Sequence, residues 1–188
     1  MAEVLVIPRQ SMADLPLEGV WPLAQGSMPT GYRWLPRAQA EQDEAFLQII
    51  PYLLLRDRQG AIWSYRRTGG DRRLTGRSSC GLGGHIDRED EQARLIDTIR
   101  LALHRELREE LENPPEGDCQ MRSWLYEGHS AVGRVHLGAV HTLCWEAEAM
   151  PLPRAGEALE GIGFMPPEAI ARNADFELWS RLAAASLT

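Results

Sequence analysis

The chain has 188 residues, of which 44% are hydrophobic, which is enough for one domain with a full core. Its formal net charge of −7 disfavours general nucleic-acid binding, and it has no apolar run of the roughly 18 residues that a membrane span needs. The beginning, MAEVLVIPRQ, lacks a basic segment followed by a long apolar stretch, and the three cysteines form no CxxC pair. We therefore expect a cytoplasmic protein without disulfides, and neither nucleic acid nor a membrane as a partner.

The expected strands are apolar or alternating runs bounded by turn residues. They lie at residues 3–9, 46–56, 61–68, 124–127, 134–148 and 161–165. The run 46–56 is nearly continuously apolar, which is typical of a buried strand, and Pro51 is expected to break it. Residues 10–44 contain several prolines and glycines and are interpreted as a long structured loop, with Trp21 and Trp34 packing on the body.

Helices are expected at residues 90–112, 167–172 and 176–187. Strands thus flank one long helix and precede a shorter one at the end, which favours a mixed sheet packed between helices. We expect one domain over 1–188, with an N-terminal extension, a core and a C-terminal strand and helix. These three parts are 1–45, 46–150 and 151–188.

A glycine turn precedes the long helix, and acids cluster in the last turn of that helix. An apolar stripe at helical spacing is formed by Leu95, Ile99 and Ala102. The same face continues to Glu106 and Glu109, with Glu110 beside them. Acids usually line the opposite face of an amphipathic helix, and three carboxylates within one turn repel each other. The cluster is either a solvated acidic turn, neutralised by neighbouring arginines, or a site for a hard divalent cation.

The hexapeptide RELREE at residues 105–110 matches the core of the Nudix box, Arg-Glu-aliphatic-any-Glu-Glu, and Gly83-Gly84 matches the glycine end of that box. The chain therefore resembles the Nudix hydrolases, in their MutT-like phosphoesterase branch, from Phe46 to about Glu148. The resemblance implies an α/β fold of the Nudix type, an α/β/α sandwich with a mixed β-sheet between helices, with the box at 83–112.

The chain departs from the family pattern in its spacing. The family places the glycine about fourteen residues before the arginine, whereas Gly84 and Arg105 are 21 positions apart, an insertion of seven. The first acid of the box is then Asp97, counted back from Arg105, or an acid within 89–91, counted forward from the glycines. Glu112 stands where the family has a further glycine.

The resemblance implies hydrolysis of a diphosphate linkage in a nucleoside diphosphate derivative, with Mg²⁺ or Mn²⁺ as cofactor and a small-molecule nucleotide or diphosphate as substrate. A homodimer is a family-level expectation. The implied metal ligands are Glu106, Glu109, Glu110 and the carbonyl of Gly84. The implied catalytic residues are Glu106, Glu109 and Arg105, the last by orienting a carboxylate. In several relatives the base is a glutamate outside the box, for which the candidates are Glu127, Glu146, Glu157 and Glu160.

All 20 basic residues are arginines, and several of them precede the glycine turn. A substrate with two phosphates needs countercharge, and guanidinium groups bind phosphate through two parallel hydrogen bonds. The expected substrate-binding residues are Arg66, Arg67, Arg73 and His85. The alternatives are that the arginines are solvated surface residues and that His85 is a hydrogen-bonded loop residue. His136 and His141 are interpreted as structural or pocket-lining.

Two other functions compete with the hydrolase. A non-catalytic nucleotide-binding module of the same fold commonly loses acids of the box, whereas this chain keeps all three. Isopentenyl-diphosphate isomerases share the fold and carry a catalytic cysteine near the position of Cys80. A cysteine at the end of an apolar strand is more often a small buried residue.

Overall fold

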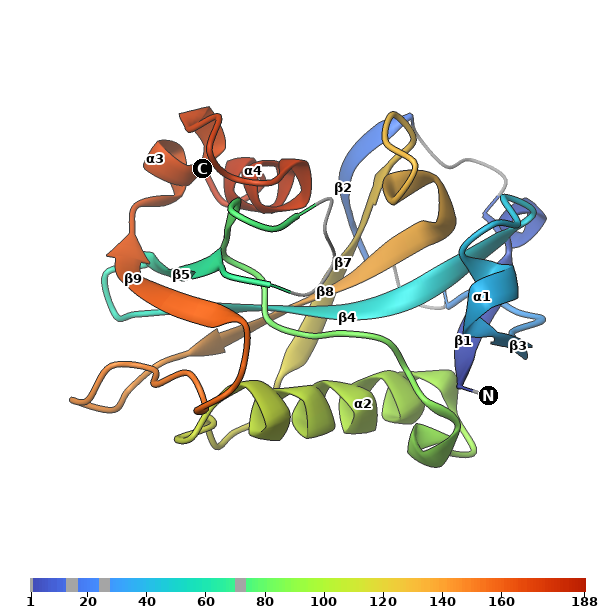
Figure 1. The fold of residues 1–188 in the computed structure, drawn as a ribbon, viewed down its shortest axis with the longest axis horizontal. Helices are drawn as coiled ribbons and strands as arrows, with labels where there is room; N and C mark the ends of the chain where they lie inside the picture. The colour runs from blue at the N-terminus through green and yellow to red at the C-terminus, as the bar shows by residue number, and fades with distance from the viewer. Residues whose placement is uncertain (1, 13–16, 24–27, 70–73) are drawn as a thin grey trace.

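The computed structural model describes residues 2–12, 17–23, 28–69 and 74–188. Its strands form one mixed sheet, with α2 on one face and α3 and α4 on the other (Figure 1). The strands are β1 Glu3–Pro8, β2 Glu18–Pro22, β3 Arg33–Pro36, β4 Phe46–Arg56, β5 Ile62–Arg67, β6 Ser78–Ser79, β7 Gln120–Glu127, β8 His136–Cys144 and β9 Leu159–Met165. The helices are α1 Arg37–Ala40, α2 Leu95–Glu110, α3 Pro167–Arg172 and α4 Leu178–Ala185, with short 3₁₀ turns η1 Arg9–Ser11, η2 Arg88–Asp90 and η3 Gly133–Val135. The predicted α/β/α sandwich with a mixed sheet is confirmed.

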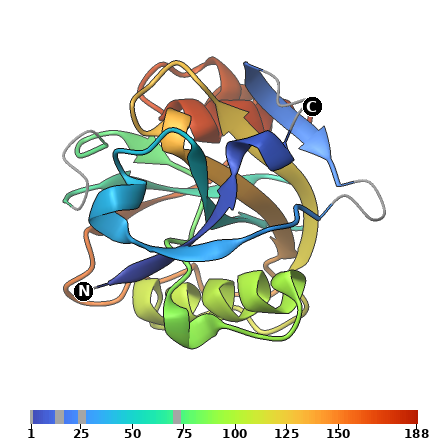
Figure 2. The same cartoon turned by 90° about the vertical axis from the view of Figure 1, so that its right-hand side faces the viewer.

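The sheet has the order β2-β7-β8-β4-β1-β3, and β5 extends it by pairing with β4, β6 and β9. The long pairing of β4 with β8 is parallel, whereas the other strand pairs are antiparallel. The view turned by 90° shows the same layers, with α2 along one side of the sheet and α4 along the other (Figure 2). In the described part of the chain, no helix is both long and apolar enough to span a membrane.

Strand β4 supplies the centre of the core because both of its faces are covered. Ile49 and Leu53 face the side of α2, and Tyr52 and Leu54 face the side of α3 and α4. Complete burial of one such aliphatic side chain stabilises the fold by about 1.5–3 kcal/mol. The sheet thereby forms a rigid support for the glycine turn that follows β6.

The expected break at Pro51 was wrong, because β4 runs through it. The N–H of Leu53 points away from β8 and donates to the carbonyl of Leu82, with a distance of 2.8 Å. Pro51, two residues earlier, has its ring nitrogen on that same side, where no strand of the described chain pairs with it. The proline therefore removes no ladder hydrogen bond.

The interpretation of residues 10–44 as a loop was also incomplete, because β2, β3 and α1 lie there. These elements are short. Strand β2 pairs with β7 and β3 pairs with β1, both of which are distant in the sequence, so local patterns do not reveal them. Trp21 and Trp34 pack against the core cluster beside α2, as predicted.

Helix α2 begins later than predicted. The turn η2 ends at Asp90, residues 91–94 are extended or bent, and the helix starts at Leu95. It ends at Glu110 because Leu111 has extended backbone angles and forms a bridge with Pro153. The buried residues Leu95, Ile99 and Ala102 confirm the predicted apolar stripe.

Candidate active site

A cavity of about 620 Å³ opens beside the glycine turn on the α4 face of the sheet. Its wall combines aromatic, cationic and backbone groups from separate elements. Among the lining residues are Tyr52, Arg67, Gly84, His85, Glu127 and Trp179. A pocket of this size with a few polar groups is typical of small-molecule sites.

The glycine turn lies between β4 and the acidic end of α2. Gly83 has φ +138°, and a Cβ there would lie 2.0 Å from the carbonyl oxygen of Pro51. A Cβ at Gly84 would lie 2.4 Å from Glu106 Oε2. The backbone N–H of Gly83 donates to Glu110 Oε2, with a distance of 3.2 Å. Gly83 is therefore needed where the backbone lies against β4, and Gly84 where it lies against the carboxylate of Glu106.

Arg105 connects the turn to the acid cluster. Its Nη2 donates to the carbonyl oxygen of His85 at 2.9 Å and to Asp90 Oδ2 at 2.9 Å. Its Nη1 donates to Glu106 Oε1 at 2.9 Å and to Glu109 Oε2 at 3.2 Å. The hydrogen bonds to Asp90 and the charge of Glu106 raise the pKa of Arg105 above its usual range. Arg105 thus orients several carboxylates and is tied to the cavity wall through the backbone of His85.

The two candidates for the first acid of the box, Asp90 and Asp97, lie in different surroundings. Asp90 is 2% exposed and accepts hydrogen bonds from Arg105 and from the backbone N–H of Asp87. Asp97 lies on the outer side of α2 and binds the exposed Arg94 and Arg100. Asp90, which lies within the range counted forward from the glycines, is therefore the candidate that contacts Arg105, and its place as the first acid of the box stays a prediction.

Two carboxylates of the cluster are costly to ionise. Burial raises the pKa of Glu110 to about 8, and the nearby Glu106 adds to the rise, while Arg67 and the Gly83 N–H oppose it. Burial also raises the pKa of Glu106, against the effect of Arg105. Glu109 differs, because its side chain is 53% exposed. Closely spaced acids with raised pKa values are typical of sites that bind a cation or transfer a proton.

The predicted substrate-binding residues are only partly brought together. Arg67 and His85 line the cavity, whereas Arg66 is exposed and is absent from its described lining. Arg73 lies outside the described residues. Arg77, which the prediction passed over, lines the cavity.

Arg67 is held by an aromatic and an acidic neighbour. Its Nη2 donates to the Tyr65 hydroxyl at 3.1 Å and lies 4.0 Å from Glu177 Oε1. Its Nε is buried and has no hydrogen-bond partner among the described residues. Its guanidinium is always charged, as for any arginine, and the neighbouring Tyr65 and Glu177 raise its pKa further above the usual range. Arg67 therefore brings a fixed positive charge to the cavity.

Of the four glutamates outside the box, Glu127 lines the cavity and Glu157 lies near enough to Glu110 to raise its pKa. Glu127 is 3% exposed and accepts hydrogen bonds from the backbone N–H groups of His129 and Ser130. Glu146 and Glu160 are exposed. The choice among them as a base stays a prediction.

Sequence reasoning missed Glu177 and the network around it. Its carboxylate accepts hydrogen bonds from the hydroxyls of Ser79, Ser180 and Tyr52. Glu177 follows α3 in the chain and carries no motif, so only the fold reveals that it lies beside Arg67.

Cys80 lies in the same buried region. It is 1% exposed, its thiol lies 3.8 Å from the carbonyl oxygen of Ser180, and burial raises its pKa to about 12. A buried thiol of this kind stays protonated at neutral pH, which argues against the isomerase-like role for Cys80.

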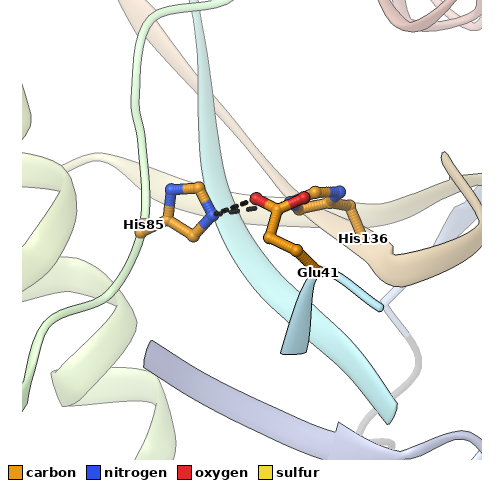
Figure 3. Close-up of side chains that lie close together, drawn as sticks. All are labelled: Glu41, His85 and His136. Atoms are coloured by element: carbon orange, nitrogen blue, oxygen red, sulfur yellow. Dashed lines mark hydrogen bonds and ion pairs between the residues drawn. The ribbon is translucent and has the colours of Figure 1, made fainter. Parts of the chain in front are cut away.

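Sequence reasoning also missed Glu41. Among the described residues, one group brings three possible metal-ligand atoms within 4.8 Å of one another. It consists of Glu41, His85 and His136 (Figure 3). Among the same described residues, the acids of α2 do not bring three ligand atoms within that distance of one another.

No protein-family model matches the chain. The solved structure of Tm1382, a proposed Nudix hydrolase, superposes with a TM-score of 0.80 at 22% sequence identity and covers 98% of this chain and 97% of that one. DR0079 from Deinococcus radiodurans superposes with a TM-score of 0.52 at 18% identity and covers 88% of this chain and 94% of that one. A bifunctional NMN adenylyltransferase/ADP ribose pyrophosphatase from Francisella tularensis matches with a TM-score of 0.51 at 15% identity, over 74% of this chain and 39% of that one.

These likenesses, together with the glycine turn and the RELREE helix, define a protein of the Nudix fold, and the predicted resemblance is confirmed. Within that fold the chain is 30% identical over 155 residues to Protein YmaB of Bacillus subtilis (strain 168), a match that covers 74% of both proteins. The chain belongs to the family of YmaB.

Proposed function

We propose that the protein is a divalent-metal-dependent hydrolase that cleaves a diphosphate linkage in a nucleoside diphosphate derivative. The observation that carries the proposal is the packing of Glu106 and Glu110 against Gly83 and Gly84 at the wall of the cavity. Carboxylates that are hard to ionise, lying beside a ligand-sized pocket, are suited to a cation that acts on a bound substrate.

The donor atoms near α2 are of the chemical kind that Mg²⁺ or Mn²⁺ binds. Such ions prefer oxygen ligands, which Glu106, Glu109, Glu110 and the carbonyl of Gly84 would supply. Burial and repulsion from neighbouring carboxylates raise the pKa values of Glu106 and Glu110, so a bound cation would relieve an unfavourable arrangement of charge. When bound, such a cation supplies charge neutralisation at phosphoryl oxygens and lowers the pKa of a bound water.

The remaining residues have supporting roles in this proposal. Arg105 holds Glu106 and Glu109 in place through its hydrogen bonds. Arg67 and Arg77 bring positive charge to the cavity, where diphosphate oxygens need it. Tyr52 and Trp179 pack edge to face at 5.6 Å and offer an aromatic wall for a base or sugar.

Two observations weigh against the alternatives. A binding module without catalysis does not need all three acids of the helix, which this chain keeps. An isomerase that uses a cysteine needs a reactive thiol, whereas burial raises the pKa of Cys80 to about 12.

The experiment is a hydrolysis panel that names the substrate class. The purified protein is incubated with Mg²⁺ or Mn²⁺ and nucleoside triphosphates, ADP-ribose, NADH, dinucleoside polyphosphates, sugar nucleotides or isopentenyl diphosphate. ADP-ribose is included because the Francisella tularensis neighbour is named as an ADP ribose pyrophosphatase. Release of a mononucleotide or phosphate from one class is the expected result. A folded protein that binds these compounds and turns over none of them contradicts the proposal and favours the binding module.

A further inference from the structure

Two histidines and one glutamate converge at the cavity wall, away from the acids of α2. Glu41 follows α1, His85 follows the glycine turn, and His136 begins β8, and all three line the cavity. His85 Nε2 lies 3.4 Å from His136 Nε2 and 3.9 Å from Glu41 Oε1. In Figure 3 the carboxylate of Glu41 and both imidazole rings point toward one another. The three residues come from distant parts of the sequence, so their convergence is a property of the fold.

We propose that Glu41, His85 and His136 form a second metal site, which binds a divalent ion of the Zn²⁺ class and leaves one position open to the cavity. Two imidazole nitrogens and a carboxylate oxygen are the ligands that zinc takes in open, three-residue sites. Two nitrogens bound at about 2.0–2.1 Å to a tetrahedral ion lie about 3.3–3.4 Å apart. The observed separation of 3.4 Å between the two Nε2 atoms agrees with that value.

His136 is already arranged to act as a ligand. Its Nδ1 lies 2.7 Å from the carbonyl oxygen of Val132, so Nδ1 carries the proton and donates it there. In the neutral ring the lone pair is then on Nε2, which is the atom that faces His85. A backbone carbonyl that accepts from the far ring nitrogen is the usual support for a metal-binding histidine.

The other two residues also have polar neighbours. His85 Nε2 lies 3.1 Å from Gln48 Oε1, and Gln48 Nε2 donates to the carbonyl of Val135. Because the amide oxygen of Gln48 accepts, His85 Nε2 carries the ring proton in this contact, and an ion that binds at Nε2 requires that proton to move to Nδ1. The Glu41 side chain is 24% exposed, and its Oε1 lies 3.9 Å from His85 Nε2 and 3.8 Å from Arg37 Nε.

This site is separate from the cluster on α2 but shares a residue with the loop that supports it. The carbonyl oxygen of His85 accepts from Arg105, whereas its ring faces Glu41 and His136. The open position faces the cavity, where an oxygen anion such as a phosphoryl group completes the coordination.

The test measures Zn²⁺ binding by calorimetry and the visible absorption of the Co²⁺ form, without any substrate. Wild type is compared with His85→Gln and Glu41→Gln. The matched control is His129→Gln, because the His129 side chain is 51% exposed and its Nε2 lies 3.2 Å from Glu18 Oε2. A Glu109→Gln/Glu110→Gln variant removes two acids of α2, and melting curves without metal establish that each variant is folded.

The expected result is one Zn²⁺ per wild-type chain and the strong visible bands of tetrahedral Co²⁺. His85→Gln and Glu41→Gln should each weaken Zn²⁺ binding by at least about tenfold, whereas His129→Gln and the α2 variant should keep it. Wild type that binds no Zn²⁺, folded triad variants that bind as wild type does, or loss of the ion in the α2 variant would each overturn the proposal. None of these readouts depends on hydrolysis, so failure of the proposed hydrolase leaves this test intact.

Discussion

Asp90 and Arg105 are joined by paired hydrogen bonds that close the inserted segment of the box. Arg105 Nε lies 3.1 Å from Asp90 Oδ1, and Nη2 lies 2.9 Å from Oδ2. The two side chains are 3% and 18% exposed, so the pair is largely shielded from water. The seven extra residues therefore lengthen the chain between these two groups without separating them.

Asp90→Asn should destabilise the protein much more than Asp97→Asn. The first change removes the charged acceptor of Arg105 Nε and Nη2 in a shielded place, while Glu106 and Glu109 still bind Nη1, and the loss of a hydrogen bond between charged groups costs about 1.5–3 kcal/mol. Asp97 forms exposed ion pairs, which contribute less than about 1 kcal/mol. Urea unfolding of both variants measures the difference. Equal and small effects would show that Asp90 is not the acid that holds Arg105.

Gly84→Ala should disturb the carboxylate of Glu106, because the added Cβ would lie 2.4 Å from its Oε2. Overpacking of this kind costs about 1–3 kcal/mol, and we expect the displaced carboxylate to lower metal-dependent turnover. Gly161→Ala is the control, since a Cβ there meets Trp63 at an ordinary 3.4 Å. Wild-type turnover and stability in Gly84→Ala would contradict the close approach of the turn to α2.

Arg67→Gln should raise KM for a diphosphate substrate, whereas Arg66→Gln should not. The neighbours differ because Arg67 lines the cavity and Arg66 is exposed on the other face of β5. Loss of a charged hydrogen bond of about 1.5–3 kcal/mol corresponds to a rise in KM of roughly 10- to 150-fold. Steady-state kinetics with the substrate from the hydrolysis panel measures it, with melting curves as a check on folding. The same KM in both variants would remove Arg67 from the substrate site.

The free energy of unfolding should decrease as the pH falls from 7 to 5, because His141 is buried in its neutral form. Burial lowers the pKa of His141 to about 4, whereas the unfolded chain keeps a pKa near 6.5. The unfolded state therefore binds the proton first, and stability that is present above pH 6.5 is lost as the pH falls toward 4. The loss between pH 7 and pH 5 amounts to about 2 kcal/mol.

His141→Gln should abolish that part of the pH dependence, since the amide does not titrate. The control His129→Gln should retain the wild-type profile, because this histidine is exposed. The measurement is the free energy of unfolding in urea at both pH values. Identical pH profiles for wild type and His141→Gln would show that the ring is not buried in its neutral form.

The order of apolar runs was sufficient to predict the layered fold and the strand β4 with its exact bounds, because burial on both faces leaves a continuous signal. The acids of α2 were predictable because they interrupt an apolar stripe at helical spacing. By contrast, β2 and β3 depend on pairing with remote strands, which no local pattern records.

The rest of the site depended on contacts that only the fold creates. The sequence could not decide between Asp90 and Asp97, because the insertion makes the count forward from the glycines disagree with the count back from Arg105. Glu41 and Glu177 stand in unremarkable sequence, yet one lies beside His85 and the other beside Arg67. Arg66 and Arg67 are equivalent in sequence, and only the pleat of β5 separates the exposed residue from the one at the cavity.

The most direct test of the central claim is the metal dependence of turnover in wild type and in Glu109→Gln/Glu110→Gln. The control Glu112→Gln changes an exposed glutamate just beyond the helix. We predict that turnover requires Mg²⁺ or Mn²⁺ in wild type and in the control. In the double variant we predict a loss of turnover of at least about a hundredfold, which is the effect expected when groups that stabilise transition-state charge are removed. Turnover that is independent of added metal after chelation, or a double variant as active as wild type, would contradict the assignment of the α2 carboxylates as the catalytic metal site.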